Sequence, residues 1–275
     1  MKFFKKLLSY PIGSLIAPAG KIIYQFIMLR EYRVLIFYKF YYGLKKRYRP
    51  LKLHLNGNLV TAPDVASFLS MYNEIYVNKI YELNIPPIKI LDLGANIGLS
   101  ALWLNNMYPE STIVAYEADP EIFKFLEMNV AHIENITIHN KAIWSEKAKL
   151  RFSSEGSDGG RVNTTDINNR NIISAIDIKD VLTDNEFDFI KMDIEGAESI
   201  VLPECSGLLD NTKYLFFEYH SLATEGQNLG RILSDLTDQN FRIHMHSSNA
   251  SKQPFEKVNT IAGYDMLLNV FAYKQ

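Results

Sequence analysis

Six carboxylate or imidazole side chains follow apolar stretches of the chain, at the points where buried strands are expected to end. They are Asp92, Glu117, Asp193, Glu195, Glu218 and His220. Ligands of an open α/β sheet bind beyond the carboxyl ends of its strands, so we expect these side chains to converge despite their separation in the sequence. Carboxylates hold hydroxyl groups and an imidazole accepts a proton near neutral pH, so the set could bind a polar molecule and deprotonate it.

A glycine turn separates the first of these acids from a helix. Residues 88–93 are mostly apolar and predict a parallel strand buried on both faces, and the residues after the turn have the apolar spacing of a helix. Gly94 can adopt a positive φ angle and let a ligand approach the main chain, and Gly98 allows the helix and the strand to pack closely. The first amide groups of this helix have no partner within it, so we expect the turn to form a ligand cradle.

The spacing of the turn argues against a phosphate ligand. Dinucleotide sites use GxGxxG, in which the second glycine admits a pyrophosphate, and Asn96 occupies that place here. The string GxxxxGK followed by Ser or Thr does not occur in the sequence. The next strand, at residues 113–116, ends in Glu117, which has the position of the acid that binds a ribose diol in nucleotide-binding folds. Asp119 and Pro120 then predict the N-cap and the first residue of a helix.

Five motifs, in order, make the chain resemble S-adenosylmethionine-dependent methyltransferases, and the string IKMDIEGAE at residues 190–198 narrows the resemblance to the FkbM family. The others are ILDLGANIG from Ile90, YEADP from Tyr116, NKAIWSE from Asn140 and FFEYH from Phe216. The resemblance implies a doubly wound α/β fold with a mostly parallel, seven-stranded, Rossmann-like sheet. It also implies S-adenosylmethionine as the cofactor and methyl transfer, usually onto an oxygen of a glycan or another secondary metabolite.

Positions in these motifs indicate the cofactor-binding residues. Glu117 is expected to bind the ribose, and Asp92 with the backbone of residues 94–98 is expected to position the amino-acid end. Residues 140–143 lie where the adenine would stack, which rests on likeness to the family. The predicted cofactor-binding set is Asp92, Gly94, Ala95, Asn96, Gly98, Glu117, Ala118, Asn140, Ala142 and Asp193.

Methyl transfer to a hydroxyl also requires that a proton be removed. The predicted catalytic set is His220, Glu218, Asp193 and Glu195. His220 is the first candidate for the general base because imidazole titrates near neutral pH, and a structural histidine is the alternative. Glu195 and Glu198 could instead be acids that the dipole favours in the first turn of a helix.

Other polar residues have structural interpretations. Lys191 lies in an apolar strand and needs a paired charge, for which Glu218 and Asp193 are the candidates. His244 and His246 alternate on a late strand, but two ligands without a third make a weak metal site. We assign no metal site from the sequence, and a magnesium site built from Asp and Glu stays open.

The charge of the chain is divided unevenly. Residues 1–52 hold twelve Lys or Arg and one acid, and the remainder holds seventeen basic and thirty acidic residues. The basic segment is also rich in aromatic and aliphatic side chains, which suits an anionic membrane surface, and it contains no apolar run long enough to span a bilayer. The alternatives are helices that cap the domain or form a dimer, or contact with an anionic glycan or nucleic acid, although we expect no nucleic-acid partner.

We divide the chain into a basic helical extension at 1–50, a hairpin and lead-in helix at 51–84, and the methyltransferase domain at 85–275. The hairpin is expected to turn at residues 56–58, and the helix to cover residues 65–83. A later hairpin would pair residues 150–152 with 162–164 across a mobile loop at 153–160, which could close over an acceptor. Later strands are expected at residues 136–139, 187–192, 214–219, 241–245 and 266–273, and an amphipathic helix at 229–236.

The sequence favours a cytoplasmic protein that could lie at the inner face of the cell membrane. The single cysteine, Cys205, cannot form an internal disulfide and is expected to be buried by packing, and no small-residue cleavage site is visible. The acceptor we expect is a saccharide or a lipid-linked glycan. Another small molecule, a lipid or a protein is the alternative acceptor, and DIEG at 193–196 argues against base methylation because it replaces an NPPY-type segment. An inactive cofactor-binding scaffold is the non-enzymatic alternative.

Overall fold

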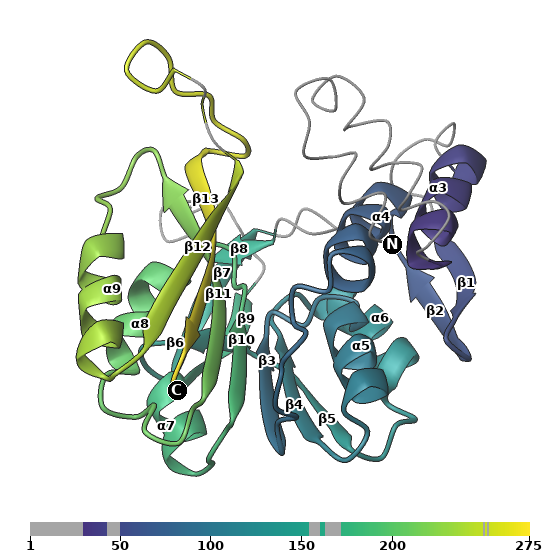
Figure 1. Ribbon diagram of the computed structural model, residues 1–275, viewed down its shortest axis with the longest axis horizontal. Helices are drawn as coiled ribbons and strands as arrows, with labels where there is room; N and C mark the ends of the chain where they lie inside the picture. Colours follow the sequence, from purple (N-terminus) through teal and green to yellow (C-terminus); the bar gives the residue numbers. More distant parts are fainter. Residues whose placement is uncertain (1–29, 43–49, 154–159, 163–171, 250, 252) are drawn as a thin grey trace, which may run out of the picture.

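The computed structural model describes residues 30–42, 50–153, 160–162, 172–249, 251 and 253–275. Its centre is a seven-stranded sheet in the order β12-β13-β11-β10-β3-β4-β5 (Figure 1). Five of its strands are parallel: β3 (Lys89–Leu93), β4 (Thr112–Glu117), β5 (Ile136–Asn140), β10 (Phe189–Met192) and β11 (Tyr214–Leu222). The other two, β12 (Arg242–Asn249) and β13 (Tyr264–Tyr273), are antiparallel. The predicted fold class is therefore confirmed.

Helices cover both faces of this sheet (Figure 1). One face carries α4 (Val65–Tyr72), the π-helix η1 (Asn73–Val77), α5 (Leu99–Met107) and α6 (Pro120–Val130). The other carries α7 (Ile178–Thr183), α8 (Glu198–Glu204) and α9 (Leu229–Asp238). Ile90 and Phe189 pack on the first face, whereas Leu91 and Ile190 pack on the second. Burial on both faces explains why the central strands are apolar throughout.

Aspartate side chains cap the starts of α6 and α7, and the first of these caps was predicted from the sequence. Asp119 accepts a hydrogen bond from the Glu121 amide at the start of α6, and Asp177 caps α7. The lead-in helix is shorter than predicted, because α4 ends at Tyr72, η1 ends at Val77, and Lys79 then adopts a left-handed φ of 53°. That conformation cannot continue a right-handed helix.

A second sheet was only partly predicted. It has the order β6-β9-β7-β8, formed by β6 (Ala142–Trp144), β7 (Ala148–Ser153), β8 (Arg161–Val162) and β9 (Ile172–Asp177). The predicted hairpin pairs Phe152 with Val162, and residues 163 and 164 lie outside the described residues. The loop predicted to be mobile also falls largely outside them. Strands β6 and β9 were not expected from the sequence.

The described part of the N-terminal extension packs on the core. The hairpin forms as predicted from β1 (Leu51–Leu55) and β2 (Asn58–Ala62), and the helix α3 (Arg30–Tyr42) lies against α4. Leu35 of α3 is only 1% exposed, and the rings of Tyr38 and Phe68 pack edge to face. Residues 1–29 and 43–49, which hold most of the basic side chains, lie outside the described residues.

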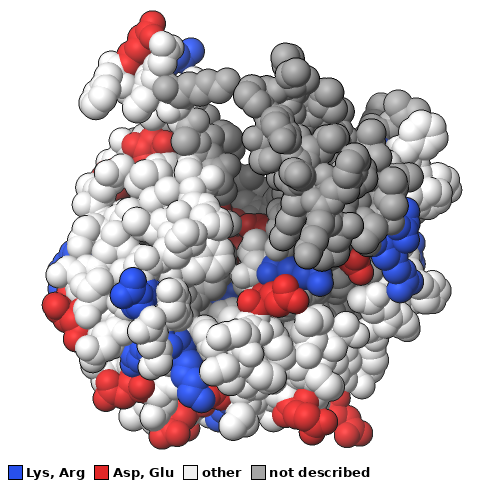
Figure 2. Space-filling model, viewed as in Figure 1, with Lys and Arg blue, Asp and Glu red and all other residues white. Residues whose placement is uncertain are grey.

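Charge is mixed on the visible surface of the described residues. Lys, Arg, Asp and Glu are interspersed on the face shown in Figure 2. Among the described residues, none of the helices has both the length and the apolar character needed to cross a membrane. Cys205 is buried at the end of α8, as expected.

Candidate active site

A cavity of about 590 Å³ opens at the carboxyl ends of the parallel strands. The predicted residues in its wall are Gly94, Ala95, Asn96, Glu117, Ala118, Ala142, Asp193, Glu195, Glu218 and His220. The acids and the imidazole thus converge, although they come from three different strands, β4, β10 and β11. Asp92, Gly98 and Asn140 were predicted with them but do not line the cavity.

The glycine turn is shaped by its own hydrogen bonds. The amides of Gly94 and Ala95 both donate to Tyr116 O at 2.9 Å, the amide of Ile97 donates to the Asn96 side chain, and that of Gly98 donates to Ala95 O. Each amide of residues 94–98 therefore already has an acceptor within the protein. The prediction that the first amides of the helix face the ligand concerns residues from Leu99 onward and stays a prediction. What the turn offers a ligand is space.

Gly94 is the residue that creates this space. Its φ is +77°, and a Cβ atom at this position would lie 1.8 Å from the backbone oxygen of Asp193. Gly98 was predicted to let the helix pack against the strand. A Cβ atom added at Gly98 would instead meet the side chains of Leu126 and Val130 of α6. Only glycine can therefore bring β3, α5 and α6 this close together.

Glu117 fastens the same turn from β4. Its two carboxylate oxygens accept the amides of Asn96 and Asp119, each at 2.8 Å. Burial raises the pKa of Glu117 to about 7, although the two amide bonds act in the opposite direction. A carboxylate has about four acceptor positions, so two remain for a diol.

Asp92 and Asn140 do not line the cavity but contact residues that do. Asp92 is fully buried, accepts a hydrogen bond from the Ser100 hydroxyl and lies 3.2 Å from the Lys191 ammonium group. Asn140 donates to Glu117 O at 2.9 Å. Any effect that these side chains have on a ligand is therefore exerted through the turn and through Glu117.

Lys191 is the paired structural charge that the sequence predicted. It is 3% exposed and donates to Gly94 O at 2.5 Å, so it supports the glycine turn. Asp92 is its neighbour in the β3–β10 register, and Asp193 lies 3.9 Å away. Burial alone lowers the pKa of Lys191, but the two aspartates outweigh it and raise that pKa. The nearer partner of Lys191 is thus Asp92, which was not predicted. Of the two predicted candidates, Asp193 lies within ion-pair distance of Lys191.

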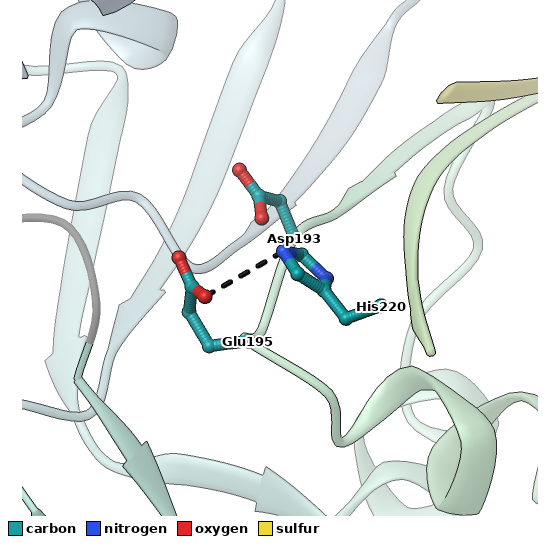
Figure 3. A group of neighbouring side chains, drawn as sticks. All are labelled: Asp193, Glu195 and His220. Carbon is teal, nitrogen blue, oxygen red and sulfur yellow. Dashed lines mark ion pairs between the residues drawn. The ribbon is translucent and has the colours of Figure 1, made fainter. Parts of the chain in front are cut away.

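His220 lies on β11 between two carboxylates. Its Nε2 atom is 3.5 Å from Glu195 Oε2 (Figure 3). Its Nδ1 atom is 3.3 Å from Glu198 Oε1 and 3.1 Å from Glu218 O. Burial lowers the pKa of His220, but Glu198 and Glu195 raise it well above its ordinary value. Burial also raises the pKa of Glu195, despite the opposite effect of His220. The charge of each group therefore affects the pKa of the other.

Glu198 has the structural role that the sequence analysis considered, that of an acid in the first turn of a helix. It is an acid of the first turn of α8, is completely buried, and accepts the amides of Ile194 and Gly196. Glu195 precedes the helix and adopts a left-handed φ of 55°. The helix-dipole interpretation thus fits Glu198 but not Glu195, which lines the cavity.

Glu74 and Tyr264 are among the residues of the wall that were not predicted from the sequence. Glu74 reaches the cavity from η1 and accepts a hydrogen bond from Asn269 at 2.9 Å, and burial raises its pKa. Tyr264 donates to Glu195 O at 3.1 Å, and its ring lies 4.9 Å from that of His220. No motif marks either residue, because Glu74 lies in the lead-in segment and Tyr264 follows the last motif. A π-helix often occurs at a functional site, but η1 is visible only in the structure.

Three side chains could hold a metal ion. Ligand atoms of Asp193, Glu195 and His220 all lie within 4.8 Å of one another (Figure 3). On the exposed edge strand β12, the Nε2 atoms of His244 and His246 are 2.9 Å apart, but no third ligand joins them among the described residues.

The doubly wound sheet, the glycine turn and the strand-end acids define the class of S-adenosylmethionine-dependent methyltransferases. Residues 92–243 match the family model described as the methyltransferase FkbM domain, which is more than half of the chain. The chain therefore belongs to the FkbM methyltransferase family.

Named relatives carry the same function in their descriptions. Methyltransferase 1 of Beauveria bassiana (strain ARSEF 2860) is 30% identical over 87 residues, which are 30% of this chain and 35% of that protein. Methyltransferase sdnD of Sordaria araneosa is 38% identical over 63 residues, which are 22% of this chain and 24% of that protein. The matched stretches thus span about a third or less of these relatives' own length. The solved methyltransferase FkbM of Methylobacillus flagellatus KT shares 18% identity, with a TM-score of 0.45 over 75% of this chain and 53% of that one.

Proposed function

We propose that this protein transfers a methyl group from S-adenosylmethionine to a hydroxyl group of a saccharide or a lipid-linked glycan. The observation that carries the proposal is a single cavity lined both by the glycine turn with Glu117 and by a group of acids around His220. We assign the first group to the cofactor end and the second to the acceptor end. S-adenosylmethionine supplies an electrophilic methyl group when bound, so the chain must bind it, hold the acceptor in line and remove a proton.

The cofactor end fits S-adenosylmethionine. Glu117 keeps acceptor positions for the ribose hydroxyls, and the missing side chain of Gly94 leaves room beside the end of β10. Residues 141–143 line the same end, where the adenine is expected. The acids of the cavity wall would also favour the positive charge of the cofactor's sulfonium.

The acceptor end fits a molecule rich in hydroxyl groups. Its wall carries the carboxylates of Glu74, Asp193, Glu195 and Glu218 together with His220. Carboxylates accept hydrogen bonds from hydroxyls, and an anionic acceptor would be repelled. The hydroxyl proton passes to this strand-end group, with His220, Glu195 and Glu218 as the candidate bases.

Titration calorimetry with S-adenosylmethionine tests the cofactor site. The intact chain is expected to bind one equivalent, and Glu117→Ala to weaken binding by about tenfold or more, because a diol contact through a carboxylate is lost.

His220→Ala is expected to retain cofactor binding but to lose most of its turnover against glycans extracted from the source cells. The control is His132→Ala, at an exposed position, which is expected to stay active.

These outcomes separate the alternatives. Failure of the intact chain to bind the cofactor overturns the proposal, as does unchanged affinity in Glu117→Ala. Binding without turnover on any extract would favour the inactive scaffold. Methyl incorporation into a lipid, a protein or a small molecule without sugar would replace the saccharide as the acceptor.

We also propose that the protein works at the inner face of the cell membrane, held there by its basic extension. The exposed face of α3 supports this idea, since Phe37, Phe40 and Tyr41 are 62%, 86% and 58% exposed. Aromatic side chains beside basic residues favour the interface of an anionic bilayer. A helix that only caps the domain or forms a dimer is the competing interpretation.

A further inference from the structure

The geometry points to a binding site for one divalent cation formed by Asp193, Glu195 and His220, at the acceptor end of the cavity. The three side chains come from the turn after β10 and from β11, and they point toward one another (Figure 3). All three line the cavity, and their ligand atoms lie within 4.8 Å of one another. Two carboxylates and one imidazole are a donor set that Mn²⁺ and similar divalent ions accept.

The spacing fits ligands around a cation better than it fits a direct bond. His220 Nε2 and Glu195 Oε2 are 3.5 Å apart, whereas a charge-assisted N–H···O bond is about 2.7–2.9 Å long. Ligand atoms that each lie about 2.1 Å from one cation are about 3 Å apart when they are neighbours in an octahedron. A cation between the two side chains would therefore need only a small adjustment of their positions.

The orientation of His220 is that of a metal ligand. Its Nδ1 atom faces Glu198 Oε1 and the backbone oxygen of Glu218, and both of these atoms can act as acceptors of its proton. The Nδ1 position therefore carries a hydrogen, and Nε2 points into the cavity. Ligating histidines usually donate their other ring nitrogen to a carboxylate in this way. The side chain is also 96% buried, so the ring is held in place before a ligand arrives.

The charge of the cavity wall favours a cation at this position. Acids at the acceptor end are Glu74, Asp193, Glu195 and Glu218, and the lysines among the described residues of the wall are Lys141 and Lys191. Lys191 is already engaged with Asp92 and with Gly94 O. Lys141 lies beside Ala142 at the cofactor end. A divalent ion would offset the remaining negative charge where the acceptor enters.

Such an ion would change which group accepts the proton of the acceptor hydroxyl. This step rests on the proposed function, whereas binding of the ion does not. An acceptor hydroxyl bound to the ion is more acidic, so it is deprotonated more readily. The oxygen–carbon bond then forms as the carbon–sulfur bond breaks, and the sulfide leaves with the electron pair. Because His220 Nε2 would be a ligand in this state, the hydroxyl proton would pass to another carboxylate of the wall, for which Glu218 is the candidate.

The test is a titration of the intact chain with Mn²⁺ after treatment with EDTA and desalting. Free Mn²⁺ is followed by electron paramagnetic resonance, and S-adenosylmethionine binding is measured on the same samples. We expect one bound ion per chain and a loss of affinity of about tenfold or more in His220→Ala and in Glu195→Gln. The control is the double variant His244→Ala/His246→Ala, which removes the other histidine pair and is expected to bind Mn²⁺ normally.

The readouts keep this inference separate from the proposed function. Absence of stoichiometric Mn²⁺ binding in a chain that binds S-adenosylmethionine overturns the cation site alone. Binding that survives in His220→Ala and disappears in the control variant overturns it as well, because the ion then lies on β12. Loss of S-adenosylmethionine binding by the intact chain instead overturns the proposed function, whatever the result with Mn²⁺.

Discussion

At the scale of single residues, the buried Glu117 carboxylate accepts two hydrogen bonds from the described part of the chain. Each carboxylate oxygen holds one backbone amide, and burial raises the pKa of the group to about 7. Between the ordinary value and about 7, the folded protein therefore holds a proton that the unfolded chain has lost. The sign follows directly: this group stabilises the fold at low pH, and that contribution is lost as the pH rises through about 7.

Cofactor affinity should show the opposite dependence on pH. A protonated Glu117 cannot accept bonds from two ribose hydroxyls while it also holds two amides. We expect the dissociation constant for S-adenosylmethionine to be about tenfold higher at pH 6 than at pH 8, because one pH unit below the pKa leaves about a tenth of the group ionised. Calorimetry at pH 6, 7 and 8 measures this. Glu117→Gln should bind weakly at every pH, and an equal slope in that variant would assign the effect to another group.

At the scale of elements, the turn between β3 and α5 is pressed against the end of β10. Replacing Gly94 by Ala places a Cβ atom 1.8 Å from Asp193 O at a φ of +77°, so the turn or the strand must move. We expect a loss of about 3 kcal/mol or more in the free energy of unfolding, together with loss of cofactor binding. Urea unfolding followed by circular dichroism measures the change.

A matched glycine supplies the control for this substitution. Gly57 has a φ of +88°, but a Cβ atom there would meet nothing within 4 Å. Gly57→Ala should therefore show only the backbone strain, about 1 kcal/mol. Similar losses in both variants would mean that the contact with Asp193 O carries no weight.

The elements also show how far the sequence could predict the site. The order of apolar strands and strand-end acids was enough to place Glu117, Asp193, Glu218 and His220 around one cavity. It could not show that the amides of residues 94–98 are already engaged, because their acceptors include Tyr116 O and Glu117 from a different strand. Nor could it show β6 and β9, whose pairing joins segments far apart in the chain. Contacts of this kind depend on tertiary packing, which leaves no periodic pattern.

At the scale of the whole molecule, the described part of the N-terminal extension has two sides. One side packs on the core, and the other exposes aromatic side chains. Leu35 of α3 is buried, so deletion up to residue 50 would uncover part of the core as well as remove the basic segment. A chain that begins at Arg30 keeps α3 and removes Lys2, Lys5, Lys6 and Lys21. This version is the better comparison for any test of membrane contact.

Vesicle flotation then tests the membrane proposal. We expect the intact chain to float with vesicles that contain phosphatidylserine at low salt and to be released at about 0.5 M NaCl, because screening weakens the attraction. The version that begins at Arg30 should float markedly less, and Phe40→Ser in the intact chain should also reduce flotation. Equal flotation of the two lengths, or none by the intact chain, would favour the capping helix.

The three consecutive residues from Lys191 to Asp193 couple the two ends of the cavity. Lys191 holds the carbonyl of Gly94, and Asp193 lines the acceptor end while its backbone oxygen limits the same turn. An exchange within this tripeptide would disturb both reactants at once. Glu74 and Tyr264 also line the cavity, but they belong to η1 and β13 and not to this tripeptide. On the proposed function, substitutions at Glu74 and Tyr264 would alter the acceptor end while leaving Lys191, Met192 and Asp193 unchanged.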